Sequence, residues 1–233
     1  MSQPRAILFD VFGTCVDWRE GVAREVAAAA ARIGVSLDAH EFADAWRKLY
    51  QPSMEEVRSG RRAWTILDVL HRESLEALLP RFGLERLGAA ARDDLNLAWH
   101  RLDPWPDVVS GLTRLKTKFT IGPLSNGNVA LLLDMAKRAG MPWDVILGAE
   151  TSRAYKPLPA AYLNAAAMLG LAPGEVLLGA AHNDDLAAAR SVGFQTAFVP
   201  RREHPRQRRD LEPNSDWTVV ARDFVDLAAK LGA

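Results

Sequence analysis

Residues 5–14 decide the fold, and they read Arg5-Ala6-Ile7-Leu8-Phe9-Asp10-Val11-Phe12-Gly13-Thr14. An uninterrupted apolar run that ends in an acid is typical of a buried strand in a parallel sheet. Gly13 permits a sharp turn directly after this strand. We therefore expect a buried strand that presents Asp10 at its carboxyl end.

Beyond residue 103 the pattern alternates between helix and strand. The sequence predicts helices at 108–117, 129–139, 159–169 and 186–192, and strands within 120–127, 145–147, 176–179 and 196–199. This alternation predicts an α/β fold with a doubly wound, Rossmann-like parallel sheet covered by helices on both faces. In such sheets ligands bind at the carboxyl ends of the strands, so the site is expected there.

Between the first strand and this α/β region the sequence is helical throughout. Helical spacings of apolar residues predict helices over 19–33, 39–50, 61–79 and 84–101. The run Asp103-Pro104-Trp105-Pro106 then marks a linker, because two prolines break a helix. We predict a core domain formed by residues 1–15 and 103–233, with a helical domain, 16–102, inserted into it.

Composition excludes several classes of protein. The chain has 233 residues, and its 29 Lys and Arg balance its 29 Asp and Glu, so no net charge attracts it to nucleic acid or to an anionic membrane. We interpret the basic run 201–209 as a solvated loop. Cys15 is the only cysteine, which fits a reducing compartment. No signal peptide or membrane span is recognisable, and we expect a cytoplasmic protein.

Polar residues follow several of the predicted strands and can meet at one edge of the sheet. Asp10 ends the first strand, Ser125-Asn126 ends a second, the run 182–185 follows a third, and Lys156 lies in a loop. An aspartate with an ordinary pKa near ~4 is ionised at neutral pH and can act as a nucleophile. The turn 11–14 also offers backbone N–H groups that can bind an anion. For Asp10 alone, capping of the next helix is the simpler interpretation.

Taken together, these residues resemble the haloacid dehalogenase superfamily. Its first motif is an Asp followed four residues later by Thr or Val, as in Asp10 to Thr14. Ser125-Asn126 resembles the second motif, Lys156 in Tyr155-Lys156-Pro157 resembles the third, and Asp185 resembles part of the fourth. The resemblance covers most of the chain and implies that the helical insert is the cap domain of this fold.

Two departures from the common pattern bear on the reaction. Most superfamily members are magnesium-dependent phosphotransferases with a second Asp two residues after the nucleophile, and here that position is Phe12. Gly179-Ala180-Ala181 stands where those enzymes usually carry a magnesium-binding acid. A halide leaving group needs no proton, and an apolar wall beside the carboxylate favours displacement. The chain is therefore most similar to the L-2-haloacid dehalogenase branch, which implies no metal and no cofactor.

The resemblance implies a role for each site residue. Asp10 would displace halide from C2 with inversion, and water would then attack the Asp10 carbonyl, so that an L-2-haloacid yields a D-2-hydroxyacid. Lys156 would hold Asp10, Thr14 would steady it, and Asp185 would position Lys156 or help to activate the water. The predicted substrate-binding and halide-binding residues are Val11, Phe12, Trp46, Arg47, Ser125, Asn126 and Tyr162.

The fourth motif differs from that of the best-known members, which carry Ser and Asn where Ala180 and His182 stand. His182-Asn183 can take over activation of the water, although a histidine at a strand end is as often structural. We therefore predict His182 and Asn183 as catalytic together with Asp185. Cys15 has no positioned base in the sequence and is interpreted as a small buried hydrophobe.

Two alternatives stay open from the sequence. One is a magnesium-dependent phosphatase that works despite the altered motifs, against which Phe12 argues. The other is a catalytically silent binding protein that keeps the fold, which the presence of Asp10, Lys156 and Asp185 disfavours. We expect a small 2-haloacid as the substrate, and the resemblance alone implies a homodimer. Side-chain identity does not reveal which halogen is removed or which chain length is accepted.

Overall fold

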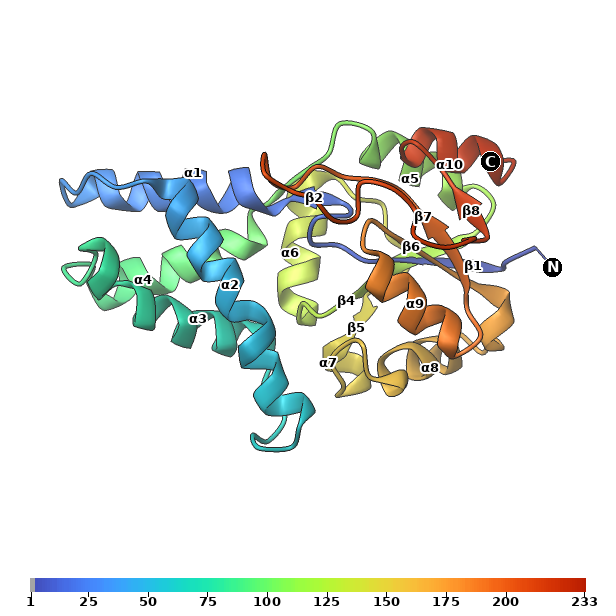
Figure 1. Cartoon of the computed structure of the whole chain (residues 1–233), viewed down its shortest axis with the longest axis horizontal. Coiled ribbons are helices and arrows are strands. Elements are labelled where there is room, and N and C mark those ends of the chain that lie inside the picture. Colours follow the sequence, from blue (N-terminus) through green and yellow to red (C-terminus); the bar gives the residue numbers. More distant parts are fainter. Residues whose placement is uncertain (1–2) are drawn as a thin grey trace.

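The computed structural model describes residues 3–233, and its main element is a six-stranded parallel sheet with the order β5-β4-β1-β6-β7-β8 (Figure 1). The central strand β1 pairs with β4 on one side and with β6 on the other. Because the connections run in opposite directions from β1, the carboxyl ends of these three strands form the crevice in which such sheets bind ligands. The strands are β1 (Ala6–Phe9), β4 (Thr120–Ser125), β5 (Leu147–Gly148), β6 (Val176–Ala180), β7 (Gln195–Phe198) and β8 (Val219–Val220).

Alternate residues of β1 serve two separate hydrophobic cores. Ile7 and Phe9 are buried against the helices on one face, where the ring of Phe9 stacks on that of Phe224, while Leu8 is buried on the other face. The predicted doubly wound α/β fold is confirmed. One face carries α5 (Val108–Lys116), α6 (Val129–Ala139) and α10 (Phe224–Lys230), the other α8 (Pro159–Met168) and α9 (Asn183–Ser191), and α7 (Ala149–Ser152) and η3 (Pro173–Glu175) lie in connections.

The helices predicted between the first strand and the α/β region form a group to one side of the sheet, which we call the helical cap (Figure 1). A short antiparallel pair, β2 (Val16–Asp17) and β3 (Asp103–Pro104), joins the chain where it leaves and re-enters the core. The predicted domain boundary at 16–102 stays a prediction. The helical cap comprises α1 (Trp18–Arg32), α2 (Ala39–Arg58), α3 (Leu67–Leu78), η1 (Pro80–Phe82), α4 (Ala89–Asn96) and η2 (Leu97–His100).

The limits of several predicted helices differ in the structure. The helix predicted over 39–50 continues to Arg58 through Pro52, and the one predicted over 61–79 begins only at Leu67. The helix predicted over 84–101 begins only at Ala89 and is divided into α4 and η2. Proline removes one helical hydrogen bond, yet α2 continues because Met54 is buried in the cap and Arg58 donates to the Lys156 carbonyl oxygen at 2.9 Å. This extension carries α2 to the edge of the core.

The end of the chain contains elements that the sequence did not predict. Strand β8 pairs with β7, and helix α10 packs on α5. The strand predicted at 145–147 is limited to Leu147–Gly148. Within residues 3–233, no helix combines the length and the apolar character needed to cross a membrane.

Candidate active site

Asp10 lies directly after β1, at the predicted edge of the sheet, and is 7% exposed. The Thr14 hydroxyl donates to Asp10 Oδ2 at 2.8 Å and accepts a hydrogen bond from the Ala181 backbone N–H at 2.9 Å. Thr14 can reach back to Asp10 because the turn passes through Gly13 with a φ of +86°, a conformation that favours glycine. The predicted steadying contact of Thr14 is therefore present.

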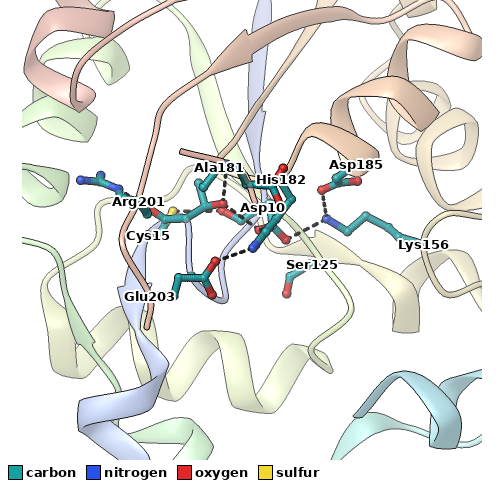
Figure 2. A network of polar contacts seen from close by, with 12 residues as sticks. Asp10, Cys15, Ser125, Lys156, Ala181, His182, Asp185, Arg201 and Glu203 are labelled. Carbon is teal, nitrogen blue, oxygen red and sulfur yellow. Dashed lines mark hydrogen bonds and ion pairs between the residues drawn. The ribbon is translucent and has the colours of Figure 1, made fainter. Parts of the chain in front are cut away.

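Lys156 joins the two carboxylates that the sequence analysis singled out. Its Nζ lies 2.9 Å from Asp10 Oδ1 and also donates to Asp185 Oδ2 (Figure 2). The Tyr162 hydroxyl donates to the other oxygen of Asp185 at 2.6 Å. Both oxygens of Asp185 are thus engaged, so its contacts suit it to orient Lys156. The Lys156 backbone N–H donates to Asn126 Oδ1 at 2.8 Å, which fixes the loop that carries the lysine.

His182 bridges Asp10 to an acid that the sequence analysis did not identify. Its Nδ1 lies 3.1 Å from Asp10 Oδ2, and its Nε2 lies 2.7 Å from Oε1 of Glu203 (Figure 2). The other oxygen of Glu203 accepts a hydrogen bond from Trp18 Nε1 at 2.6 Å. A side chain at Gly13 would collide with Glu203, since a Cβ there would lie 2.1 Å from Oε2. Gly13 thus makes both the turn and the room for Glu203.

Glu203 belongs to the segment 201–209, which we interpreted as a solvated basic loop; that interpretation is wrong for Arg201 and Glu203, whereas Arg202 between them is exposed. The Arg201 side chain is 9% exposed, and its guanidinium donates to both oxygens of Asp107 at 2.7 and 2.8 Å and to the Thr14 carbonyl at 3.0 Å. These bonds hold the start of the loop over the core and so direct Glu203 inward. An isolated acid within the basic run is the only sequence signal for it.

Burial and charge together set the protonation of this cluster. Burial alone would raise the pKa of Asp10, but the Lys156 and His182 charges hold it well below its ordinary value, so Asp10 is ionised. Burial alone would lower the pKa of His182, but the hydrogen bonds to Asp10 and Glu203 raise it well above the ordinary range. Burial alone would lower the pKa of Lys156, but the charges of Asp10 and Asp185 favour its protonated form. The pKa of Lys156 is therefore raised. Burial raises the pKa of Asp185.

The cap contributes a cation enclosed by aromatic rings. The Arg47 guanidinium carbon lies 4.2 Å from the ring centre of Tyr50, 5.3 Å from that of Trp18 and 5.9 Å from that of Phe12. Its Nη1 is buried and has no hydrogen-bond partner in the described part of the chain. A buried N–H without an acceptor is unfavourable, so this donor is suited to an incoming anion. The sequence predicted Arg47 and Phe12 but not Trp18 or Tyr50.

A cavity of about 500 Å³ opens between the cap and the core. Its wall brings together most of the predicted residues with Tyr50, Gln51 and Arg58 of the cap. The carboxylate of Asp10, the amide of Asn126 and the guanidinium of Arg47 all face this one space. The predicted residues that line it are Asp10, Phe12, Arg47, Asn126, Lys156, Tyr162, His182 and Asp185.

The structure does not bring every predicted residue to the cavity wall. Trp46 is fully buried inside the cap, where its Nε1 donates to the His71 carbonyl at 3.0 Å. It packs within the cap and does not line the cavity. The Asn183 side chain contacts Asp210, the Glu212 carbonyl, the Asn214 backbone N–H and Trp217. It holds the C-terminal loop and does not contact Asp10.

Two predicted residues lie just beneath the wall. Ser125 is fully buried, and its Oγ accepts the Gly127 backbone N–H at 3.1 Å, which shapes the turn that presents Asn126. Val11 is fully buried next to Asp10 and is not among the residues that line the cavity. Cys15 is buried, as expected, and its Sγ lies 3.2 Å from the Asp10 carbonyl oxygen. Within residues 3–233, no group of three or more His, Cys, Asp or Glu side chains is arranged to hold a metal ion.

Comparison with known proteins agrees with this geometry. A model of the haloacid dehalogenase-like hydrolase family matches residues 4–193. The chain belongs to this family. A crystal structure of a defluorinating L-2-haloacid dehalogenase is 54% identical, with a TM-score of 0.97, and the match covers 99% of this chain and 96% of the other. A second L-2-haloacid dehalogenase structure is 47% identical, with a TM-score of 0.94 and 98% of both chains covered.

A curated relative supports the same branch of the haloacid dehalogenase-like family. The (S)-2-haloacid dehalogenase 4A of Burkholderia cepacia is 31% identical over 206 residues, which is 86% of this chain and 85% of that protein. These similarities confirm the predicted L-2-haloacid dehalogenase branch.

Replacing Glu203 tests the electrostatics of the His182 bridge. The pKa of His182 is higher in the folded protein than its ordinary value, so the protonated ring stabilises the folded state. This stabilisation is fully present below about pH 6.5 and is lost as the pH rises through the raised pKa. Glu203→Gln should therefore lower the free energy of unfolding by about 1–3 kcal/mol at pH 6, with a smaller effect at alkaline pH. Urea unfolding across this pH range measures it. Glu212→Gln, in an exposed part of the same loop, is the control, and an equal loss for Glu203→Gln at every pH would contradict the bridge.

Proposed function

We propose that this protein is a hydrolytic dehalogenase of short 2-haloacids that works through an aspartyl ester. The observation that carries the proposal is an ionised, buried Asp10 facing the same cavity as the unpaired N–H of Arg47. A nucleophile and a donor for the leaving group thus line one cavity. The names of the similar proteins support the same reaction class.

In the first step an Asp10 oxygen attacks C2 of the haloacid. A carbon–oxygen bond forms as the carbon–halogen bond breaks, and the halide leaves with the bonding electron pair. Arg47, together with Asn126, stabilises the negative charge that develops on the halogen, because its donor is already in place. The Val11 backbone and the Ser125-Asn126 turn are the proposed contacts for the substrate carboxylate. Inversion at C2 makes an L-2-haloacid the source of a D-2-hydroxyacid.

In the second step water attacks the Asp10 carbonyl carbon. Formation of the ester removes the Asp10 charge, so only Glu203 continues to favour the protonated form of His182. The pKa of His182 then falls, and its Nδ1 can accept a proton from water while Nε2–H stays bonded to Glu203. The proton passes to the departing hydroxyacid oxygen, and Asp10 is regenerated as a carboxylate with release of a proton.

His182 fits this role better than Asp185. Both Asp185 oxygens are already engaged, by Lys156 and by the Tyr162 hydroxyl. His182, in contrast, has one nitrogen on Asp10 and the other on a carboxylate that orients the ring. Asp185 and Tyr162 are therefore assigned to position Lys156, and Asn183 to anchor the loop that carries Glu203.

The phosphatase alternative lacks a necessary group. Phe12 is 2% exposed and stands where a phosphatase of this superfamily carries the acid that protonates the leaving alkoxide. A halide leaves without a proton, so the same residue suits dehalogenation and helps to keep water from the nucleophile.

We extend the proposed substrates to fluoroacetate. The similar structure with 54% identity is named as a defluorinating enzyme. Fluoride is a poor leaving group that needs strong hydrogen-bond donors, and the enclosed Arg47 guanidinium offers one beside the nucleophile.

Two finer expectations accompany this proposal. We retain the homodimer and the cytoplasmic location; the exposed apolar side chains Leu163 and Met168 on α8 offer a surface for a second copy. We also retain the expectation that the enzyme needs no metal or other cofactor and binds no nucleic acid or membrane.

Halide release tests the function directly. The protein should release halide from chloroacetate, 2-chloropropionate and fluoroacetate in the presence of EDTA, and Asp10→Asn should abolish release because an amide is a poor nucleophile. Ion-selective detection measures the rates. Asp93→Asn, an exposed carboxylate of the cap, is the control. Magnesium-stimulated phosphate release from an aryl phosphate, without any halide release, would favour the phosphatase instead.

The role of His182 is tested by trapping the ester. His182→Gln should lower kcat about 10²- to 10⁴-fold, because it removes the general base but leaves the nucleophile. Mass spectrometry after mixing with chloroacetate should then find a carboxymethyl group on the peptide that contains Asp10. Glu203→Gln should show a weaker form of the same effect. If His182→Gln is slow and no ester accumulates, His182 acts before the hydrolytic step and its assignment is wrong.

A further inference from the structure

A second polar cluster lies away from the active site, where the cap meets the core; His100 and Asn128 are buried in it, Asp68 is partly buried and Asp134 is exposed. His100 Nδ1 lies 2.9 Å from Asp134 Oδ2, and His100 Nε2 lies 3.1 Å from Asp68 Oδ1. The Asn128 amide donates to Asp68 Oδ2 at 2.8 Å and accepts the Asp68 backbone N–H at 3.2 Å. Asp68 and His100 belong to the cap, and Asn128 and Asp134 to the core. We call these four residues the cap–core joint.

On the core side the joint belongs to the same turn as a residue of the active site. Asn128 precedes α6 and stands two residues after Asn126. The Asn126 side chain accepts the Lys156 backbone N–H at 2.8 Å, and Tyr50 of the cap lines the same cavity as Asn126. A displacement of Asn128 therefore moves the turn that holds both Asn126 and the Lys156 loop.

On the cap side the joint is connected to Arg47 through packed helices. Asp68 is in the first turn of α3, and the carbonyl of His71, one turn later, accepts the indole N–H of Trp46. The His71 ring also lies 6.0 Å from that of Tyr50. Trp46 directly precedes Arg47 on α2. The bond from Trp46 to α3 therefore couples the position of α3 to the position of the Arg47 guanidinium at the cavity.

We propose that Asp68 and His100 are positioning residues that hold the cap closed over Asp10 by tying α3 to the turn 125–128. This proposal rests on the proposed dehalogenase function for its effect on catalysis, but the joint itself can be observed without any substrate. In its protonated form His100 donates to both Asp68 and Asp134, whereas a neutral ring has only one N–H. Loss of the proton therefore removes one of the two contacts.

The charges around His100 determine the direction of its pH response. Burial alone would lower its pKa, but the hydrogen bonds to Asp68 and Asp134 raise it above the ordinary value. His71, the other titratable group nearby on α3, is neutral because burial lowers its pKa to about 3. Glu25 of α1 and Asp94 of α4 bind Arg101 instead of His100. The joint is therefore intact below the raised pKa of His100 and weakens as the pH rises through it.

Hydrogen exchange of the full-length protein tests the joint. After correction for intrinsic rates, protection of residues 67–70 and 125–129 should fall between pH 6 and pH 9. His100→Gln and Asp68→Asn should reduce that protection about five- to tenfold at pH 6 and remove most of its pH dependence. His40→Gln is the matched control, since His40 pairs with Glu20 at 2.8 Å within the cap and does not contact the core. It should behave as the unaltered protein does.

Kinetics with chloroacetate provide the second measurement. An opened cap lowers the fraction of binding-competent molecules, so His100→Gln should raise KM about fivefold at pH 6 with a smaller change in kcat. Unchanged protection in His100→Gln at pH 6, or the same pH response in His100→Gln and His40→Gln, would overturn the proposal. If no substrate is turned over, the dehalogenase function fails while the exchange result still decides the joint.

Discussion

The structure depends on keeping one carboxylate ionised where burial would neutralise it. Asp10 sits at the end of the central strand with little access to water, and an isolated charge there would be strongly unfavourable. Lys156 on one oxygen and His182 and Thr14 on the other make the charged form stable. Each of these partners is in turn held by a second group: Asp185 for Lys156, Glu203 for His182 and the Ala181 backbone N–H for Thr14. The C-terminal loop and the turn at Gly13 are shaped around this arrangement.

The need for an ionised Asp10 also explains the aromatic side chains around Arg47. A carboxylate displaces a halide best when water is excluded, and rings from α1, α2 and the first turn surround Arg47 without offering it an acceptor. The guanidinium is left with an N–H that has no partner in the described part of the chain. The Arg47 cation and the Asp10 anion thus line one cavity, and the cap–core joint is one of the contacts that hold cap and core together.

The sequence predicts those parts of the site that follow from strand ends. Because carboxyl ends of parallel strands meet at one edge, the sequence alone predicts that Asp10, Ser125-Asn126 and Asp185 lie together. The sequence does not predict the position of Glu203, because its side chain is directed toward His182 by the Arg201–Asp107 ion pair, which joins segments far apart in the chain. Trp18 and Tyr50 were missed for a related reason, since helical periodicity does not specify which aromatic ring faces a cation. The choice between Trp46 and Arg47 also depends on helix rotation, and only Arg47 lines the cavity.

The central claim is that Asp10 forms the bond to carbon and that water then attacks Asp10 itself. A single turnover in water enriched in ¹⁸O, with enzyme in excess over chloroacetate, tests it most directly by mass spectrometry of both the product and the peptide that contains Asp10. The account predicts that the heavy oxygen enters the Asp10 carboxylate and that the first hydroxyacid formed is unlabelled. Heavy oxygen in that first hydroxyacid, with none in Asp10, would contradict it.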